Sequence, residues 1–430
     1  MYNYKMHLTP EEIEILEGKQ GEVLGKIMKT LVMYGDTFGA SKLVPVSSEY
    51  GHLVTSFGLS MMKPVYELMD EIIDAEIETK QKFTVDPRPL DFENVPGNII
   101  QKIVFKIMYG KQKDYEEQLE KIGLLSKDGF TCTCYMDQVA NIPNKGDILS
   151  WAESSAVVYA NSVLGARCNR NSGIIEMFGS ILGKVPYFGL LTDEGRKANW
   201  IVEIKTNSLP EAQVLGSAIG MKVMDHVPYI KNLGQYFDNE LNRKAKDYLK
   251  DMGAATASNG AVGLFHVEGL TPEAKELGES LIVEDPNVYI IDDEELERVK
   301  NSYPVMWKNP DTKPKMCFIG CPHLSLEQMI QWTKDIKANL STGKREKVVI
   351  PTILTASPPV LKEFSQLPEA KELKDMGIST SYICPLMYMN NPLCGKMPVI
   401  TNSNKLRTYT TSRYYTDDEI VKAITRGEGI

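Results

Sequence analysis

Trp151 to Gly173 reads WAESSAVVYANSVLGARCNRNSG, and no other stretch of the chain is as informative. It begins with an acid and hydroxyls, continues through an apolar turn and ends in a polar cluster. Helical spacing puts Glu153 and Asn161 on one stripe, and Ser154 and Ser162 on the next. These groups and Arg167 need hydrogen-bonding partners, because burying them without partners costs free energy. The stretch alone is compatible with a polar functional site or with a core helix that has polar caps.

Length, charge and cysteine content narrow the class of protein. The chain has 430 residues, more than one ordinary core supports, so we expect two or three domains. A net charge of −9 without a basic block argues against a general nucleic-acid surface. No apolar run approaches the roughly 18 residues of a membrane span, and the start, MYNYKMHLTPEE, lacks the apolar core of a signal peptide. Seven cysteines are then expected to be reduced thiols in the cytoplasm, and the size favours an enzyme.

Short apolar strands that alternate with capped helices predict parallel α/β layers. Thr9 and Pro10 begin the first predicted helix, residues 42–46 form a strand, and 99–125 are helical. A strand followed by a helix recurs at 260–267, 315–320 and 347–354. The expected seams between subdomains are the proline-rich loop near 84–98 and the region near 278–287.

Three cysteines follow predicted strands and precede turns or helix starts: Cys132, Cys321 and Cys384. Ligands gather at the carboxyl ends of strands in open α/β sheets, so thiolates from these three loops are candidates to hold iron or an iron–sulfur cluster. The alternative for each is a plain buried cysteine. The spacing contains no CxxC pair. The motifs CTC (132–134) and CFIGC (317–321) leave open which of their members is used.

Histidines and a C-terminal turn supply further candidates. His52, His266 and His323 lie in turn-like contexts; His323 follows Cys-Pro and is a candidate neighbour of a metal site. In VITNSNKLRTYTTSRYY (399–415), Ser403 and Lys405 follow a predicted strand and make a cradle for carboxylate or phosphate, with Lys405 at the wet rim of a pocket. A solvated turn is the alternative. No dinucleotide, NTP, serine-hydrolase or zinc-protease motif stands in its required context.

Four segments together resemble one family. WAESSAVVYANSVLGARCNR, GAVGLFHVEGLTPEA, GCPHLSLEQ and VITNSNK are similar, in order, to the catalytic large subunit of aconitase X, in the aconitase superfamily of hydro-lyases. The resemblance covers nearly the whole chain. It implies an aconitase-like multi-domain α/β core with parallel or mixed sheets flanked by helices.

The resemblance also implies roles for individual residues. It implies iron ligands at Cys132, Cys321 and Cys384, and catalytic roles for Glu153, Ser154 and His52. It further implies substrate-binding roles for Asn161, Ser162, Arg167, Ser403 and Lys405. Cys134 and Cys168 depart from the residues common in the family, so the ligand within CTC stays open between Cys132 and Cys134.

We expect no counterpart of the family's swivel domain in this sequence, because no β-rich segment follows the last predicted helix. We therefore expect that domain on a separate small subunit, which by resemblance carries the serine that acts as base.

The reaction implied is loss of water from a small hydroxy acid, with an iron or iron–sulfur centre of undetermined type as Lewis acid. Within the family the substrates are cis-3-hydroxy-L-proline, which gives a pyrroline carboxylate, and mevalonate 5-phosphate. The sequence favours the amino acid, because no extra basic cluster for a phosphate stands out. A non-catalytic iron–sulfur protein on the same scaffold is the alternative of a different class.

Overall fold

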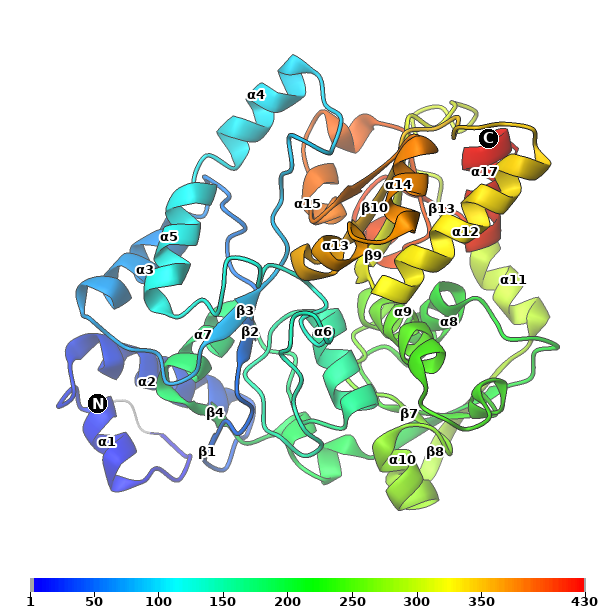
Figure 1. Cartoon of the computed structure of the whole chain (residues 1–430). Coiled ribbons are helices and arrows are strands. Elements are labelled where there is room, and N and C mark those ends of the chain that lie inside the picture. Colours follow the sequence, from blue (N-terminus) through cyan, green and yellow to red (C-terminus); the bar gives the residue numbers. More distant parts are fainter. Residues whose placement is uncertain (1–3, 429–430) are drawn as a thin grey trace.

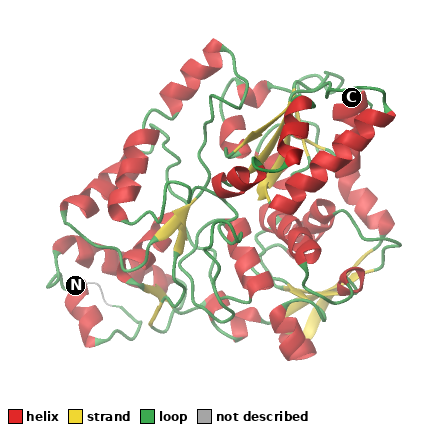
Figure 2. Cartoon of the chain, viewed as in Figure 1, coloured by secondary structure: helices red, strands yellow, loops and turns green. Residues whose placement is uncertain are grey.

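The computed structural model describes residues 4–428, in which short strands are surrounded by helices (Figure 2). Two parallel sheets dominate, one with strand order β11-β10-β9-β12-β13 and one with order β7-β6-β5-β8. A parallel pair, β2-β3, and an antiparallel pair, β1-β4, complete the strands of the described residues. The chain is thus an α/β protein with sheets flanked by helices, as the sequence predicts.

The N-terminal part is mostly helical and carries the two small strand pairs. Thr9 caps the first helix in a capping box with Glu12, and Pro10 is its first residue, which confirms the predicted start. The predicted 99–125 helix is two helices, interrupted around Gly110. The elements of this part are α1 (Pro10–Leu16), α2 (Glu22–Thr37), β1 (Leu43–Pro45), β2 (Gly51–Leu53), α3 (Lys63–Asp74), β3 (Phe83–Val85), α4 (Ile99–Met108), α5 (Gln112–Ile122), α6 (Ser154–Tyr159), a π-helical turn (Ala160–Leu164), α7 (Gly173–Leu182) and β4 (Lys184–Pro186).

The middle part forms the four-stranded sheet. The predicted strand at 260–267 is regular only at its end, and the segment before it is an extended loop. Two long buried helices of this part lie between the two large sheets (Figure 1). The elements are β5 (Ala198–Ile204), α8 (Ala212–Val223), β6 (Pro228–Lys231), α9 (Arg243–Asn259), β7 (His266–Val267), α10 (Pro272–Leu277), β8 (Ile282–Ile291) and α11 (Asp293–Asn301).

The C-terminal part is built on the five-stranded sheet, with α12 and α17 packed side by side. Its elements are β9 (Met316–Leu324), α12 (Leu326–Thr342), β10 (Thr352–Ala356), α13 (Pro358–Phe364), α14 (Pro368–Asp375), β11 (Ile378–Ser381), α15 (Pro385–Met389), β12 (Val399–Thr401), α16 (Asn404–Tyr409), β13 (Arg413–Tyr414) and α17 (Asp417–Arg426). Short 3-10 turns lie at Gly189–Leu191, Glu194–Arg196, Gly234–Phe237, Gly278–Leu281 and Cys394–Lys396.

The hydrophobic core is divided into several clusters. The largest packs α6 against the four-stranded sheet and helices α8 and α9. A second lies between the five-stranded sheet and α12 and α17, and a third fills the N-terminal part. The predicted seam at 84–98 leads from β3 to α4, and the one at 278–287 covers a 3-10 turn and the start of β8. The division into subdomains at these seams stays a prediction. None of the helices within residues 4–428 is both long and apolar enough to cross a bilayer.

Candidate active site

Parallel extended segments of the N-terminal part end side by side. His52 in β2 forms a bridge with Trp151 on one side, and β2 pairs with β3 on the other. Val85 in β3 forms a further parallel bridge with Phe130. All four segments run in the same direction, so the residues that follow them meet at one edge. Those residues are Glu153, Asp86 and Cys132.

Strands of the five-stranded sheet bring a second group to the same place. Cys321 lies within β9, Ser403 and Lys405 follow β12, and Cys384 follows β11. The neighbours β12, β9, β10 and β11 are all parallel, so these residues also lie toward carboxyl ends. The site is therefore assembled between the N-terminal and C-terminal parts of the chain.

Lys405 and Glu153 join the two groups through a buried ion pair. The Lys405 ammonium donates a hydrogen bond to Glu153 Oε1, and the side chains are 15% and 4% exposed. Glu153 is the N-cap of α6, and its Oε2 accepts from Ala156 N at 2.7 Å and from Ser155 Oγ at 2.5 Å. The sequence placed Lys405 at a wet rim. The structure instead encloses Lys405. Helix α16 begins shortly after β12, and the Lys405 side chain on it reaches Glu153 at the N-terminus of α6.

Electrostatics keep this pair charged. Burial by itself raises the pKa of Glu153, but the charge of Lys405 and the hydrogen bonds from Lys405, Ser155 and Ala156 outweigh burial and lower the pKa. For Lys405, burial lowers the pKa, but the charges of Glu153, Cys321 and Cys132 and the hydrogen bond to Glu153 together outweigh it, so the pKa is raised. A buried carboxylate and a buried ammonium therefore face each other in the site.

Two serines flank the pair. Ser154 Oγ lies 3.4 Å from Lys405 Nζ, so a residue of the opening stretch is at the site. Ser403 caps α16 by accepting from Leu406 N at 3.0 Å, and its hydroxyl donates to the carbonyl of Cys321 at 2.5 Å. Ser403 thus fixes the loop that carries Cys321.

His52 is fully buried and one of its ring nitrogens has no partner. Its Nδ1 lies 2.9 Å from Thr84 Oγ1, and its Nε2 makes no hydrogen bond among the described residues. Burial lowers the pKa of His52 to about 4, so the ring is neutral at physiological pH.

Asp86 is a site residue that the sequence analysis missed. Its Oδ1 is buried, has no partner among residues 4–428, and lies 3.7 Å from His52 Nε2. Burial and then the charge of Glu153 raise the pKa of Asp86 well above its usual range, although Lys405 opposes them. The sequence held a signal that could have identified Asp86. It directly follows the short apolar strand 83–85, and the candidate cysteines were chosen because they follow predicted strands. Two buried polar atoms that face each other without hydrogen-bond partners mark this place as a candidate functional site.

Arg170, within the polar cluster of the opening stretch, is a second cation near the pair. Its Nη2 donates only weakly, to Ala257 O at 3.4 Å, and its Nη1 has no partner among the described residues. Burial lowers the pKa of Arg170, and the neighbouring Tyr409 phenol and Glu153 carboxylate act in the opposite direction. A half-buried guanidinium with an uncommitted N–H group is a ready anion-binding group.

The three predicted cysteines are free thiols that influence one another. Burial raises the pKa of Cys132, and the charges of Glu153 and Cys321 add to that effect. Burial and then the charge of Cys321 raise the pKa of Cys384. Burial and then the charge of Glu153 raise the pKa of Cys134. Of the CTC pair, Cys132 is the one whose Sγ accepts a hydrogen bond, at 3.4 Å, from the backbone N–H of His323, two residues after Cys321.

The donor groups at the site match the chemistry of an iron centre. Three reduced thiols at or near the ends of extended segments, close to polar atoms of His52 and Asp86 that lack hydrogen-bond partners among the described residues, fit thiolate-bound iron in kind. Over residues 4–428, no three His, Cys, Asp or Glu side chains are close enough together to enclose a metal ion. The ligand set is therefore part of the proposal below.

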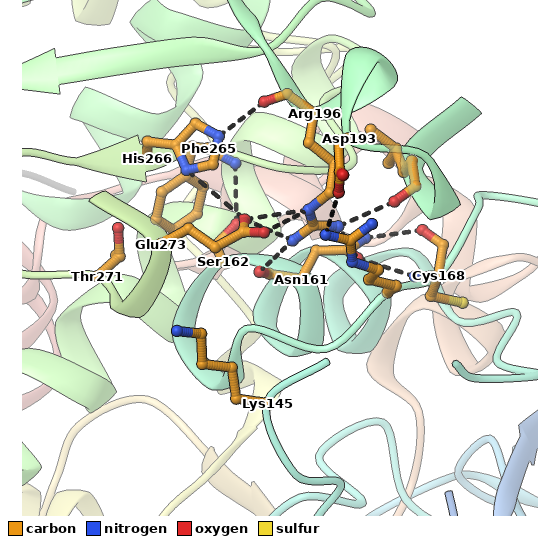
Figure 3. A network of polar contacts seen from close by, with 12 residues as sticks. Lys145, Asn161, Ser162, Cys168, Asp193, Arg196, Phe265, His266, Thr271 and Glu273 are labelled. Carbon is orange, nitrogen blue, oxygen red and sulfur yellow. Dashed lines mark hydrogen bonds and ion pairs between the residues drawn. The ribbon is translucent and has the colours of Figure 1, made fainter. Parts of the chain in front are cut away.

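Asn161 and Ser162 lie in a separate buried network (Figure 3). The Asn161 amide donates to the carbonyls of Cys168 and Gly263, and its oxygen accepts from Cys168 N and Arg196 Nη1. Ser162 Oγ accepts from Phe265 N at 2.9 Å. Arg196 is 1% exposed and forms a two-pronged ion pair with Glu273. The structure does not bring these groups to the Lys405–Glu153 pair, and their contact with a substrate stays a prediction.

Arg167 lies at the edge of the same region. Its Nη1 donates to Leu191 O at 2.9 Å, and its Nη2 pairs with Asp193, whose side chain is 89% exposed. Its substrate-binding role likewise stays a prediction.

Comparisons with known proteins show the family of this chain. The family description "Aconitase X first domain" matches residues 5–194, and "Aconitase X second domain" matches 198–301. This chain belongs to the aconitase X family. The crystal structure of the holo-form of Thermococcus kodakaraensis aconitase X is similar to the chain, with a TM-score of 0.80 at 29% identity, covering 97% of this chain and 100% of the other.

Curated aconitase X relatives are dehydratases. The phosphomevalonate dehydratase large subunit of Thermococcus kodakarensis is 34% identical over 82% of this chain and 81% of its own length. That of Methanocaldococcus jannaschii is 32% identical over 75% and 77%. The cis-3-hydroxy-L-proline dehydratase of Pseudomonas aeruginosa is 24% identical over 92% of this chain and 65% of its own length. The chain is thus a member of a family of hydro-lyases, and the words "large subunit" imply a small partner for the first two relatives.

Proposed function

We propose that this chain is the large subunit of a dehydratase that removes water from a small hydroxy acid bearing a second anionic group, with mevalonate 5-phosphate as the first candidate. The observation that carries the proposal is the Arg170 guanidinium, whose buried Nη1 has no hydrogen-bond partner among the described residues and whose charge interacts with Glu153 of the Lys405–Glu153 pair. Mevalonate 5-phosphate has a carboxylate and a phosphate, and two cations at one site match two anions. The higher identity to phosphomevalonate dehydratase large subunits supports the same substrate.

The residues have separate roles in this proposal. Lys405 and Arg170 bind the anionic groups, and Ser403 and Ser154 orient Lys405 and its neighbours through the hydrogen bonds described above. Asp86, with the free Nε2 of the neutral His52 beside it, donates the proton with which the hydroxyl group leaves as water. Glu153 holds Lys405 charged and aligned, so that the charge that develops on the substrate carboxylate meets a fixed donor.

An iron or iron–sulfur centre completes the site in this proposal. Cys132, Cys321 and Cys384 would hold it, and when bound it supplies Lewis-acid polarisation of the C–O bond that breaks. The chain's thiols are suited to this because no disulfide consumes them.

A small swivel-type subunit is the proposed partner. The relatives named as large subunits support it, and the resemblance assigns the catalytic serine that removes the carbon-bound proton to that subunit. Asn161, Ser162 and Arg167, in and beside the separate network behind α6, are the further substrate-binding candidates of this proposal.

Cis-3-hydroxy-L-proline is the second candidate. It is favoured by the Pseudomonas aeruginosa relative, which aligns over 92% of this chain. Its carboxylate needs one cation, and Lys405 supplies it.

Steady-state kinetics of the complex reconstituted with the small subunit distinguish the substrates. We expect turnover of mevalonate 5-phosphate, and a kcat/KM that falls about 10- to 100-fold in Arg170→Gln, since a charge-assisted hydrogen bond contributes roughly 1.5–3 kcal/mol. Arg413→Gln, on a guanidinium stacked against Trp307 and Tyr415, is the matched control and should stay within twofold. Turnover of cis-3-hydroxy-L-proline alone, unchanged in Arg170→Gln, would overturn the first candidate.

A further inference from the structure

His323 contacts the loops of all three proposed iron ligands. It lies two residues after Cys321 near the end of β9, and it is 1% exposed. Its ring Nδ1 lies 3.0 Å from Thr131 Oγ1, and its Nε2 lies 3.1 Å from the carbonyl of Ile383. Thr131 precedes Cys132, and Ile383 precedes Cys384. One imidazole ring therefore spans the two loops that flank its own.

The hydrogen-bond pattern determines the tautomer of this ring. A carbonyl only accepts, so Nε2 carries the hydrogen and donates to Ile383 O. Nδ1 is then the acceptor for the Thr131 hydroxyl, whose oxygen in turn accepts from Thr133 N at 3.1 Å. Burial lowers the pKa of His323 to about 4, which is consistent with a neutral ring. Every polar atom of the ring has a defined partner.

The main chain of His323 is held as firmly as its ring. Its N–H donates to Cys132 Sγ at 3.4 Å, and its carbonyl accepts from the buried ammonium of Lys250 at 3.0 Å. Lys250, in α9, also donates to Gln328 Oε1 at 2.6 Å and pairs with Asp251. The loop of Cys321 is thus fixed to the central helix while the ring reaches the other two loops.

We propose that His323 is a positioning residue that sets the spacing of the Cys132, Cys321 and Cys384 loops and so organises the thiols for iron. This inference rests on the proposed function for the iron itself. It concerns second-layer hydrogen bonds, which orient metal ligands and strongly affect metal retention.

Substitutions that remove the two ring hydrogen bonds test this role. His323→Ala removes both of them, whereas His323→Gln retains an amide that is able to donate to Ile383 O and to accept from Thr131. His266→Ala is the matched control. His266 is also 1% exposed, lies in the short strand β7, and its ring Nε2 is 2.8 Å from the carbonyl oxygen of Arg196. Thermal unfolding of the metal-free parent and variants measures how much stability each variant loses when a buried histidine is replaced.

The first measurement is iron retention by the full chain reconstituted anaerobically with iron and sulfide. We expect release to a chelator to be at least tenfold faster in His323→Ala than in the parent and in His266→Ala, and within about threefold of the parent in His323→Gln. Parent-like release in His323→Ala would overturn the proposal.

The second measurement does not depend on iron. Alkylation of the metal-free chain, read out by mass spectrometry, should be at least fivefold faster at Cys132 and Cys384 in His323→Ala, and unchanged at Cys394. Equal alkylation rates at Cys132 and Cys384 in His323→Ala and the parent would overturn the positioning role. If the parent binds no iron, the iron centre of the proposed function fails, and the alkylation rates still decide the role of His323.

Discussion

The Lys405 ammonium is hydrogen-bonded to Glu153 although the two residues are 252 positions apart in the sequence. The pair is enclosed, with side-chain exposures of 15% and 4%. Each charge offsets the desolvation of the other, so removing one of them leaves an uncompensated buried charge. This ion pair therefore contributes to the proposed chemistry, and it also holds the N-terminal and C-terminal parts of the chain together.

Lys405→Met is expected to lower both activity and stability. Losing the anion-binding cation should lower kcat/KM by about one to two orders of magnitude or more. Leaving Glu153 unpaired should lower the free energy of unfolding by roughly 3–5 kcal/mol. Steady-state kinetics of the reconstituted complex and denaturant unfolding measure the two effects.

The double variant Glu153→Gln/Lys405→Met separates these effects. It removes the stranded charge, so part of the lost stability should return while activity stays low. A kcat/KM of Lys405→Met within twofold of the parent would remove Lys405 from the substrate site.

Replacing Cys132, Cys321 or Cys384 with serine, one at a time, should abolish or strongly reduce the iron content and visible absorbance of anaerobically purified protein. Serine keeps the size of the side chain but is a poor ligand for iron–sulfur centres. Cys317→Ser and Cys394→Ser are the controls, since both thiols are buried in the same sheet region outside the proposed ligand set. Loss of absorbance in Cys134→Ser with retention in Cys132→Ser would reverse the choice within CTC. Unchanged iron in all three ligand variants would eliminate the metal centre.

Glu176→Gln is expected to stabilise the protein at alkaline pH. Glu176 is buried in α7 and bonded to Ser150 and Asn171, and burial raises its pKa to about 8. The folded state therefore holds a proton that the unfolded chain releases above about pH 4.5, so stability falls as pH rises toward 8. The amide keeps both hydrogen bonds without this loss. Its advantage over the parent should grow by roughly 3 kcal/mol between pH 5 and pH 8. Unfolding temperatures of both proteins that shift in parallel between those pH values would contradict this.

The isolated chain should show negligible dehydration, and the small subunit should restore it. The reason is that, in the proposed function, the group that removes the carbon-bound proton lies on the partner. Rates measured with and without the small subunit, at equal iron content, test this. Full activity of the chain by itself would mean that its own residues, with His52 and Asp86 as the first candidates, remove that proton.

Residues that follow strands were largely predictable, because an apolar run followed by a polar residue or a cysteine can be recognised in the amino-acid sequence itself. Cys321 and Lys405 were identified on this basis. The choice between Cys317 and Cys321 was not predictable. Gly320 has a φ of +101° and the strand pairing is irregular nearby, so the usual alternation breaks and the two thiols lie in different core clusters.

The opening stretch was only partly predictable for a similar reason. Helical spacing predicts that Glu153 and Asn161 share a stripe, but the regular helix ends at Tyr159 and continues as a π-helical turn. Asn161 therefore faces Arg196 and the loop of Cys168. Only the N-terminal polar end of this stretch, with Glu153, contacts Lys405. That contact joins residues 252 positions apart, and the periodicity of the sequence contains no information about it.

The positions of the site residues in the sequence also determine the order in which the site becomes complete during protein synthesis. Cys132 and Glu153 leave the ribosome long before Cys321, Cys384 and Lys405, which come with the strands of the five-stranded sheet. A nascent chain therefore carries Cys132 well before the other two proposed ligands exist. Delivery of the proposed cofactor has to follow the synthesis of Cys384, and a chain truncated before β11 retains two of its main cores but lacks one of the three proposed ligands.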